Sequence, residues 1–162
     1  MPAAQMYLAT KTLTNAQVLA LPTTPIEIIP APGAGKIISF ISGHITFNFN
    51  DGAYTNQDAG ASMFLRIGVS GSRYFANPVS KEGDLDNFGT YFGQNDHYTP
   101  LFVYMYANAT TGQIEYTSDW AVGDVTNKPV QILIENNAAG VLTDGHADNT
   151  MVVGLHYAII DV

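Results

Sequence analysis

The stretch KIISFISGHITFNFN, which runs from Lys36 to Asn50, decides the fold class of this chain. From Ile45 onward apolar and polar residues alternate, which is the period of a strand with one buried face. Ile38 and Phe40 are apolar on the opposite parity, so the pattern changes phase across Ser42-Gly43. Because one extra residue moves the following side chains to the other face, this change predicts a β-bulge or bend there.

Outside this stretch, short apolar or alternating runs separated by Gly, Pro, Asn and Asp predict further strands. These are Tyr7 to Leu13, Pro25 to Ile29, Ser62 to Val69, Arg73 to Phe75, Leu101 to Ala107, Gln113 to Thr117, Pro129 to Glu135 and Met151 to Ile160. The intervals Asp51 to Ala61, Asn77 to Pro100 and Ala138 to Asn149 are predicted to be long loops.

One short helical turn is predicted near the N-terminus. Thr14-Asn15 offers an N-cap ahead of Ala16 to Leu21, and Pro22 ends the turn. No longer helical period occurs, so the sequence predicts an all-β, single-domain antiparallel β-sandwich that is jelly-roll-like. We assign residues 1–24 to an N-terminal arm with the short helix and residues 25–162 to the sandwich (jelly-roll) domain.

Composition excludes several classes of function. The 162 residues include no Cys, so disulfides, zinc-thiolate sites and Cys nucleophiles are excluded. Six Lys and Arg, scattered along a chain of net charge -8, make no basic patch, which predicts no direct binding to nucleic acid. The first residues lack the features of a secretory signal, and no apolar run is long enough to predict a membrane span.

The sequence predicts no enzyme, no catalytic residue and no cofactor. His44, His97, His146 and His156 form neither a His-x-His pair nor a His-Glu-x-x-His motif, so no strong sign of a catalytic metal is present. No Gly-x-Ser-x-Gly elbow occurs. Asp84 and Asp86 lie in a Gly-rich segment typical of solvated turn residues, and sequence cannot show the separation that a pair of glycosidase carboxylates needs.

One segment resembles half of a calcium loop. Asp144, Asp148 and Asn149 place oxygen ligands around Gly145, and hard cations bind such groups. The segment lacks the residue order and the closing Glu of an EF-hand. Asp and Asn also form ordinary turns, so a plain loop is the alternative, and the sequence favours it.

Aromatic residues concentrate between Tyr91 and Tyr106. Packing in a core or at a subunit contact explains them, and the sequence favours this interpretation. The alternative is a stacking platform for sugars, for which Tyr91, Tyr98 and Trp120 are the candidates.

Both ends of the chain resemble small structural proteins of tailed bacteriophages. The opening run LTNAQVLALPTTPIEIIPAPGAGK, from Leu13 to Lys36, carries most of this resemblance, and the ending from Asn149 to Asp161 looks like the closing strand of the same group. The middle is only generically similar, and no catalytic or ligand motif is available to map onto individual residues.

This resemblance implies a virion component, most specifically a capsid decoration, or cement, protein. Such proteins are commonly sandwich or jelly-roll domains that form trimers over junctions between major capsid protein subunits. We therefore expect a homotrimer that binds the major capsid protein on the outer capsid surface after assembly in the host cytoplasm. The alternative is a carbohydrate-binding tail or fibre module that binds a receptor. The extended segment before Thr14 is a candidate for pairing with a neighbour's sheet.

Overall fold

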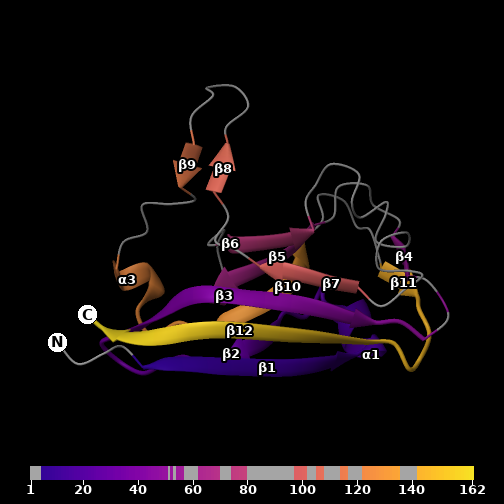
Figure 1. Cartoon of the computed structure of the whole chain (residues 1–162), viewed down its shortest axis with the longest axis horizontal. Coiled ribbons are helices and arrows are strands. Elements are labelled where there is room, and N and C mark those ends of the chain that lie inside the picture. The colour runs from indigo at the N-terminus through magenta and orange to yellow at the C-terminus, as the bar shows by residue number, and fades with distance from the viewer. Residues whose placement is uncertain are drawn as a thin grey trace.

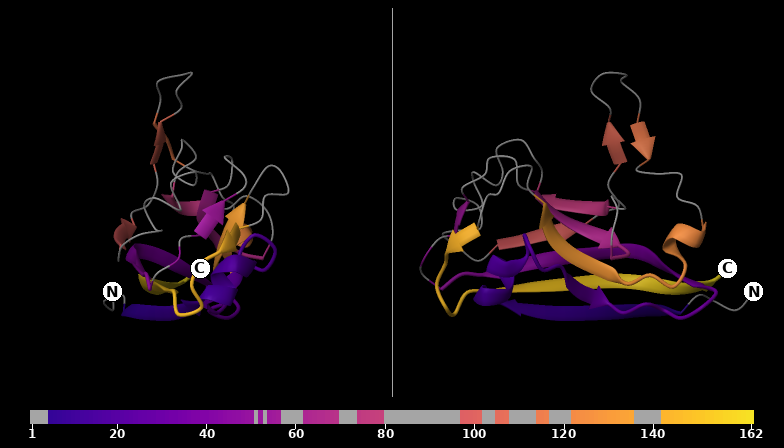
Figure 2. Two further views of the ribbon diagram at one scale, coloured as in Figure 1. Left: turned by 90° about the vertical axis from the view of Figure 1, so that its right-hand side faces the viewer. Right: turned by 180° about the vertical axis from the view of Figure 1, so that it is seen from behind.

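In the computed structural model the described residues are 5–50, 52, 54–56, 62–69, 74–79, 97–101, 105–107, 114–116, 122–135 and 142–162. Two four-stranded antiparallel sheets form most of this part of the chain (Figures 1 and 2). The first sheet has the order β1 (Met6–Thr14), β12 (Thr150–Asp161), β3 (Lys36–Asn48), β7 (His97–Leu101). The second has the order β2 (Ile26–Ile29), β10 (Val130–Glu135), β5 (Ser62–Ile67), β6 (Tyr74–Val79). The predicted all-β antiparallel sandwich is confirmed.

The strand pairing is nested along the chain. The first strand of the two sheets pairs with the last, β1 with β12, and the second pairs with the second from last, β2 with β10. Inside these, β3 pairs with β7 and β5 with β6. The chain therefore follows the path of one long antiparallel ribbon that is folded over itself into two layers.

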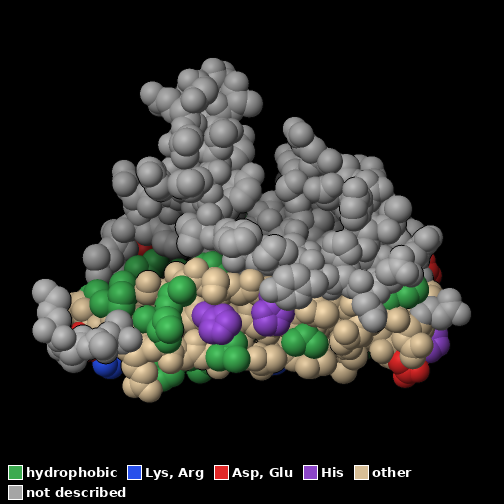
Figure 3. Space-filling model, viewed as in Figure 1, with side chains coloured by type: hydrophobic (Ala, Val, Ile, Leu, Met, Phe, Trp, Pro, Cys, Tyr) green, Lys and Arg blue, Asp and Glu red, His purple; other side chains and the backbone are tan. Residues whose placement is uncertain are grey.

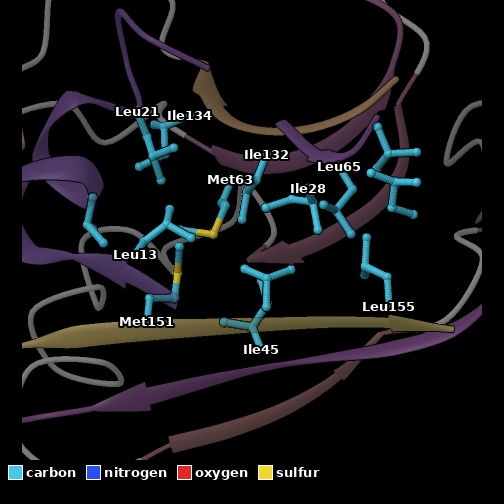
Figure 4. Close-up of a cluster of buried hydrophobic side chains, with 14 of the residues drawn as sticks. Leu13, Leu21, Ile28, Ile45, Met63, Leu65, Ile132, Ile134, Met151 and Leu155 are labelled. Atoms are coloured by element: carbon cyan, nitrogen blue, oxygen red, sulfur yellow. The ribbon is translucent and has the colours of Figure 1, made fainter. Parts of the chain in front are cut away.

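The core lies between the two layers. Side chains from the first sheet, such as Ile45 and Leu155, point toward side chains from the second, such as Leu65 and Ile132 (Figure 4). All four are buried, at 1% exposure or less. Burial of this apolar surface is the main favourable term that holds the sheets together.

The bulge predicted in the longest strand pattern is present in β3. The register with β12 shifts between His156 and Tyr157, so that Ile41 is the extra residue of β3. The bulge lies one residue before the predicted Ser42-Gly43, and it turns both apolar parities of β3 toward the core: Ile38 before it and Ile45 after it are buried.

The predicted helical turn is α1 (Asn15–Ala20), one residue earlier than expected. Thr14 is its N-cap, and the Thr14 and Gln17 side chains form a reciprocal capping box. Leu13, Val18 and Leu21, from β1, α1 and the residue after it, are fully buried in the same core as the rest of the sandwich. A second helix of one turn, α3 (Val122–Val125), was not predicted.

Two aspects of the strand prediction are wrong. The predicted strand Leu101 to Ala107 is divided between β7, which ends at Leu101, and β8 (Met105–Ala107), which pairs with β9 (Ile114–Tyr116) instead of with the sandwich. The predicted long loops contain strands: β4 (Tyr54–Asn56) pairs with β11 (Leu142–Asp144), and β7 begins at His97. Backbone ladders of three residues need no alternating pattern, so sequence periodicity does not reveal them.

Candidate functional site

The three calcium-loop candidates lie in one corner of the molecule, beside the β4–β11 ladder. Asn149 is fully buried there. Its side-chain oxygen accepts the Asn50 N–H at 2.8 Å, and its side-chain nitrogen donates to the Gly52 carbonyl at 3.0 Å. Asn149 therefore holds the turn after β3 against the start of β12.

The two carboxylates of this corner are exposed and lie in their own turns. Asp144 ends β11 with a φ of 65° and accepts a hydrogen bond from the Thr143 hydroxyl at 3.2 Å. The Asp148 backbone N–H donates to His146 Nδ1 at 3.2 Å, and its carboxylate lies 3.7 Å from the same atom. The described residues contain no group of three or more His, Asp or Glu that could hold a metal ion. The calcium-loop and plain-turn alternatives both stay predictions.

Gly145 and Tyr54 pack together at the centre of this corner. A Cβ at Gly145 would lie 2.6 Å from Tyr54 Cε1 and 2.7 Å from Asn15 Oδ1, and the Gly145 φ of 77° also favours glycine. Tyr54 is buried at 1% exposure and contacts Phe47 edge-to-face, with ring centroids 5.5 Å apart. Desolvation raises the pKa of Tyr54 to about 12, against a smaller opposing effect of a hydrogen bond to Asn149. The corner is thus a packed structural joint.

The other predicted site residues are not brought into a described site. Asp84, Asp86, Tyr91 and Trp120 lie outside the described residues, and Tyr98 lies in β7 opposite Thr46 of β3. The sugar-stacking platform therefore stays a prediction.

A broad surface that the sequence did not reveal is the outer face of the β1–β12–β3 sheet. Register places Leu8 opposite His156, Thr10 opposite Gly154, and Gly154 in turn opposite His44. The His44 ring lies over Gly154, where a Cβ would overlap it. His156 Nδ1 lies 3.4 Å from the Ser42 hydroxyl. The two histidines are thus diagonal neighbours on one face, which requires the strand register and is invisible in sequence.

The described side chains that β1, β12 and β3 place on this outer face include no Asp, Glu, Lys or Arg. The Lys36–Asp161 ion pair lies at the end of the sheet. Figure 3 shows the face toward the viewer, with two histidines side by side between neutral and apolar groups. Its side chains are Met6, Leu8, Thr10, Thr12, Ile37, Ser39, Ile41, Ser42, His44, Thr46, Asn48, Thr150, Val152, His156 and Ile160. We call this set the neutral face.

Exposed large hydrophobic side chains concentrate on or beside the neutral face. Met6 is 69% exposed, Leu8 59%, Ile41 45% and Ile160 40%. Val162, two residues after Ile160, is 56% exposed. Among the described residues only Val69 is a large exposed hydrophobic side chain elsewhere. Apolar groups gathered on one uncharged face are typical of surfaces that bind another protein.

The second sheet holds a buried cation that sequence analysis also missed. Arg66 of β5 is 7% exposed, and its Nη2 donates to Gln131 Oε1 at 2.9 Å and to the Val69 carbonyl at 3.2 Å. Because Gln131 lies on β10, directly opposite Arg66, this bond ties the two central strands together. Nothing in the sequence pattern of β5 distinguishes this arginine from an exposed one.

Comparison with known proteins gives little. No protein-family model matches the chain, and no curated protein matches it. A chain from "Structure of infectious bursal disease virus Gt strain" is similar at 12% identity with a TM-score of 0.26; the match covers 99% of this chain and 38% of that chain. This chain thus spans less than half of its neighbour, and a likeness at that TM-score carries no argument about fold or activity. None of the described helices is long and apolar enough to cross a membrane.

Proposed function

We propose that this protein is a structural component of a virus particle, and specifically a bacteriophage capsid decoration, or cement, protein. The observation that carries the proposal is the neutral face, which presents exposed Met6, Leu8, Ile41 and Ile160 on a broad sheet with no Asp, Glu, Lys or Arg between them. A cement protein needs such a surface because it acts through contact area and performs no chemistry.

The strand order supports the same proposal. We infer that the nested pairing, first strand with last and second with second from last, makes the domain a jelly roll. The bacteriophage resemblance of the two chain ends supports the phage assignment. No catalytic group is needed for this role, so we propose that the protein is not an enzyme.

The proposed mechanism is additive burial on the outer surface of the head. The protein binds the major capsid protein over junctions between subunits, as a homotrimer that repeats each contact threefold. Buried apolar area, at roughly 25 cal/mol per Å², then opposes separation of neighbouring subunits under internal genome pressure.

Composition and location of the protein in virions test this proposal. We expect it to copurify with heads at a fixed ratio to the major capsid protein, and heads that lack it to open at lower temperature. Immunogold labelling confined to the tail would overturn the cement role and favour the receptor-binding alternative.

A pair of variants tests the neutral face itself. Thr46→Glu places a charge at the centre of that face, and we expect it to weaken binding to heads, because an unpaired carboxylate would be buried in the contact. Ala34→Glu adds the same charge at an exposed turn outside the sheets and is the matched control. Equal binding of both variants to heads stripped of the protein would exclude this face as the contact.

A further inference from the structure

The outer edge of β1 has no pairing partner among the described strands. β1 is an edge strand that pairs with β12 over all nine residues, Met6 to Thr14, without a register shift (Figure 1). The strand contains neither Pro nor Gly and three of its nine residues are Thr, which favours a regular extended backbone. A long regular edge of this kind is a template for pairing with another strand.

Two hydrogen bonds establish which β1 groups face outward. The Val162 N–H donates to the Gly35 carbonyl at 2.9 Å, so even-numbered residues of β12 bond to β3 and odd-numbered residues bond to β1. The odd-numbered residues of β1 are therefore the ones bonded to β12. In agreement, the Thr14 N–H donates to Gln17 Oε1 at 3.0 Å instead of to β12. Hence Leu8, Thr10 and Thr12 direct their N–H and C=O groups to the free edge.

The other three edge strands of the two four-stranded sheets carry features that block pairing. β2 has only four residues, between Pro25 and Pro30. β6 contains Pro78, and its pairing with β5 shifts register twice. β7 contains Pro100. Short length, proline and irregular register are the devices that protect sheet edges, and β1 has none of the three.

We propose that β1 pairs antiparallel with β1 of a second copy of this chain across a twofold axis, which joins the two first sheets into one. Pairing all nine residues puts Thr10 opposite Thr10 of the second copy and Leu8 opposite Thr12. Three N–H groups of each copy, those of Leu8, Thr10 and Thr12, then meet three C=O groups of the other. An isologous contact of this kind closes after two copies and does not propagate into a fibre.

The single charge of β1 favours this register. A Lys on an edge strand commonly discourages pairing with another chain. When the full strands overlap, however, Lys11 lies opposite the small, uncharged Ala9 of the second copy. One of the two registers shifted by two residues would put the two Lys11 side chains directly opposite each other, which destabilises a cross-strand pair. The other puts Lys11 opposite Tyr7 and pairs only seven residues of each strand. The second copy is therefore the occupant whose sequence matches the edge, and the inference stands whether or not the protein is a virion component.

One substitution prevents pairing at the free edge of β1 and leaves the hydrogen bonds between β1 and β12 in place. Thr10→Pro deletes an N–H that faces the free edge, so no bond to β12 is lost. Thr10→Val, which keeps the N–H, is its control. By sedimentation equilibrium of the full chain we expect the wild type and Thr10→Val to form dimers, or hexamers in which this contact joins two of the proposed homotrimers. We expect Thr10→Pro to lose the twofold association and still unfold cooperatively.

A second pair of variants tests the register itself. Leu8 and Thr12 are exposed on the outer face, so both accept charged side chains. Leu8→Lys with Thr12→Lys creates two like-charge pairs across the axis, whereas Leu8→Lys with Thr12→Glu creates two opposite-charge pairs. We expect the dissociation constants to differ by about tenfold at low salt, with the first variant weaker.

Three results would overturn the inference. These are a wild type that is monomeric at all concentrations, a wild type that forms only trimers, and equal dissociation constants for the two charge variants. If Thr10→Pro fails to fold, the charge pair still decides the outcome. Loss of head binding with intact dimers would reject the cement function alone, so the two proposals fail separately.

Discussion

Gly145→Ala probes the packed corner most directly. The substitution adds a Cβ that would lie 2.6 Å from Tyr54 Cε1 and 2.7 Å from Asn15 Oδ1, closer than real Cβ atoms approach. The Tyr54 ring is 1% exposed and rests against Phe47, so it has little room to move. Overpacking costs about 1–3 kcal/mol, and a non-glycine residue at positive φ costs about 1–2 kcal/mol more.

We therefore expect Gly145→Ala to lower the free energy of unfolding by about 3 kcal/mol, which for a domain of this size is a loss of about 6–12 °C in Tm. Gly33→Ala is the matched control. Its φ of 104° carries a backbone strain at least as large, but a Cβ there has no neighbour within 4 Å. Calorimetry of both variants separates strain from packing. If Gly145→Ala is no more destabilising than Gly33→Ala, the packing argument for the corner is refuted.

Four further outcomes are expected. Asn149→Ala leaves the Asn50 N–H and the Gly52 carbonyl without their bonds and should cost about 2–4 kcal/mol in urea unfolding, whereas exposed Asp148→Ala should change stability by less than about 0.5 kcal/mol. Thr14→Ala removes the capping box and should cost about 1 kcal/mol, unlike Thr12→Ala on the same strand. The folded-state pKa of Tyr54, about 12, lies above its unfolded value of 10.0. The contribution of the protonated Tyr54 to the free energy of unfolding is therefore complete below pH 10 and is lost as pH rises toward 12. An ultraviolet titration should show one tyrosine that ionises at higher pH than the others, and Tyr54→Phe should lack this step. Finally, adding calcium or a chelator should leave Tm unchanged, and a calcium-dependent rise in Tm that Asp148→Ala abolishes would favour the calcium-loop alternative over the plain turn.

Local patterns predicted the elements well because each rests on a few neighbouring residues. The phase change around Ser42-Gly43 identified the bulge to within one residue, and Thr14-Asn15 identified the helix cap. The neutral face was beyond such patterns. His44 and His156 are far apart in sequence, and only the register of β3 against β12 makes them neighbours. A strand pattern says which side chains share a face of one strand, but not which strand lies beside it.

The strand pairing also explains why β1 has a free edge. In a nested ribbon the first strand pairs with the last. Because β3 pairs with the other side of β12, β1 has no second neighbour among the described strands of its sheet. The free edge therefore follows from the topology, whereas its regularity follows from the sequence. β2, β6 and β7 occupy edges for the same topological reason and carry proline neighbours, prolines or register shifts, while β1 carries nine regularly paired residues with one charge. A chain that protects three edges and leaves the longest one open is best explained by a partner strand at that edge, and the symmetry of the Met6–Thr14 register makes that partner a second copy.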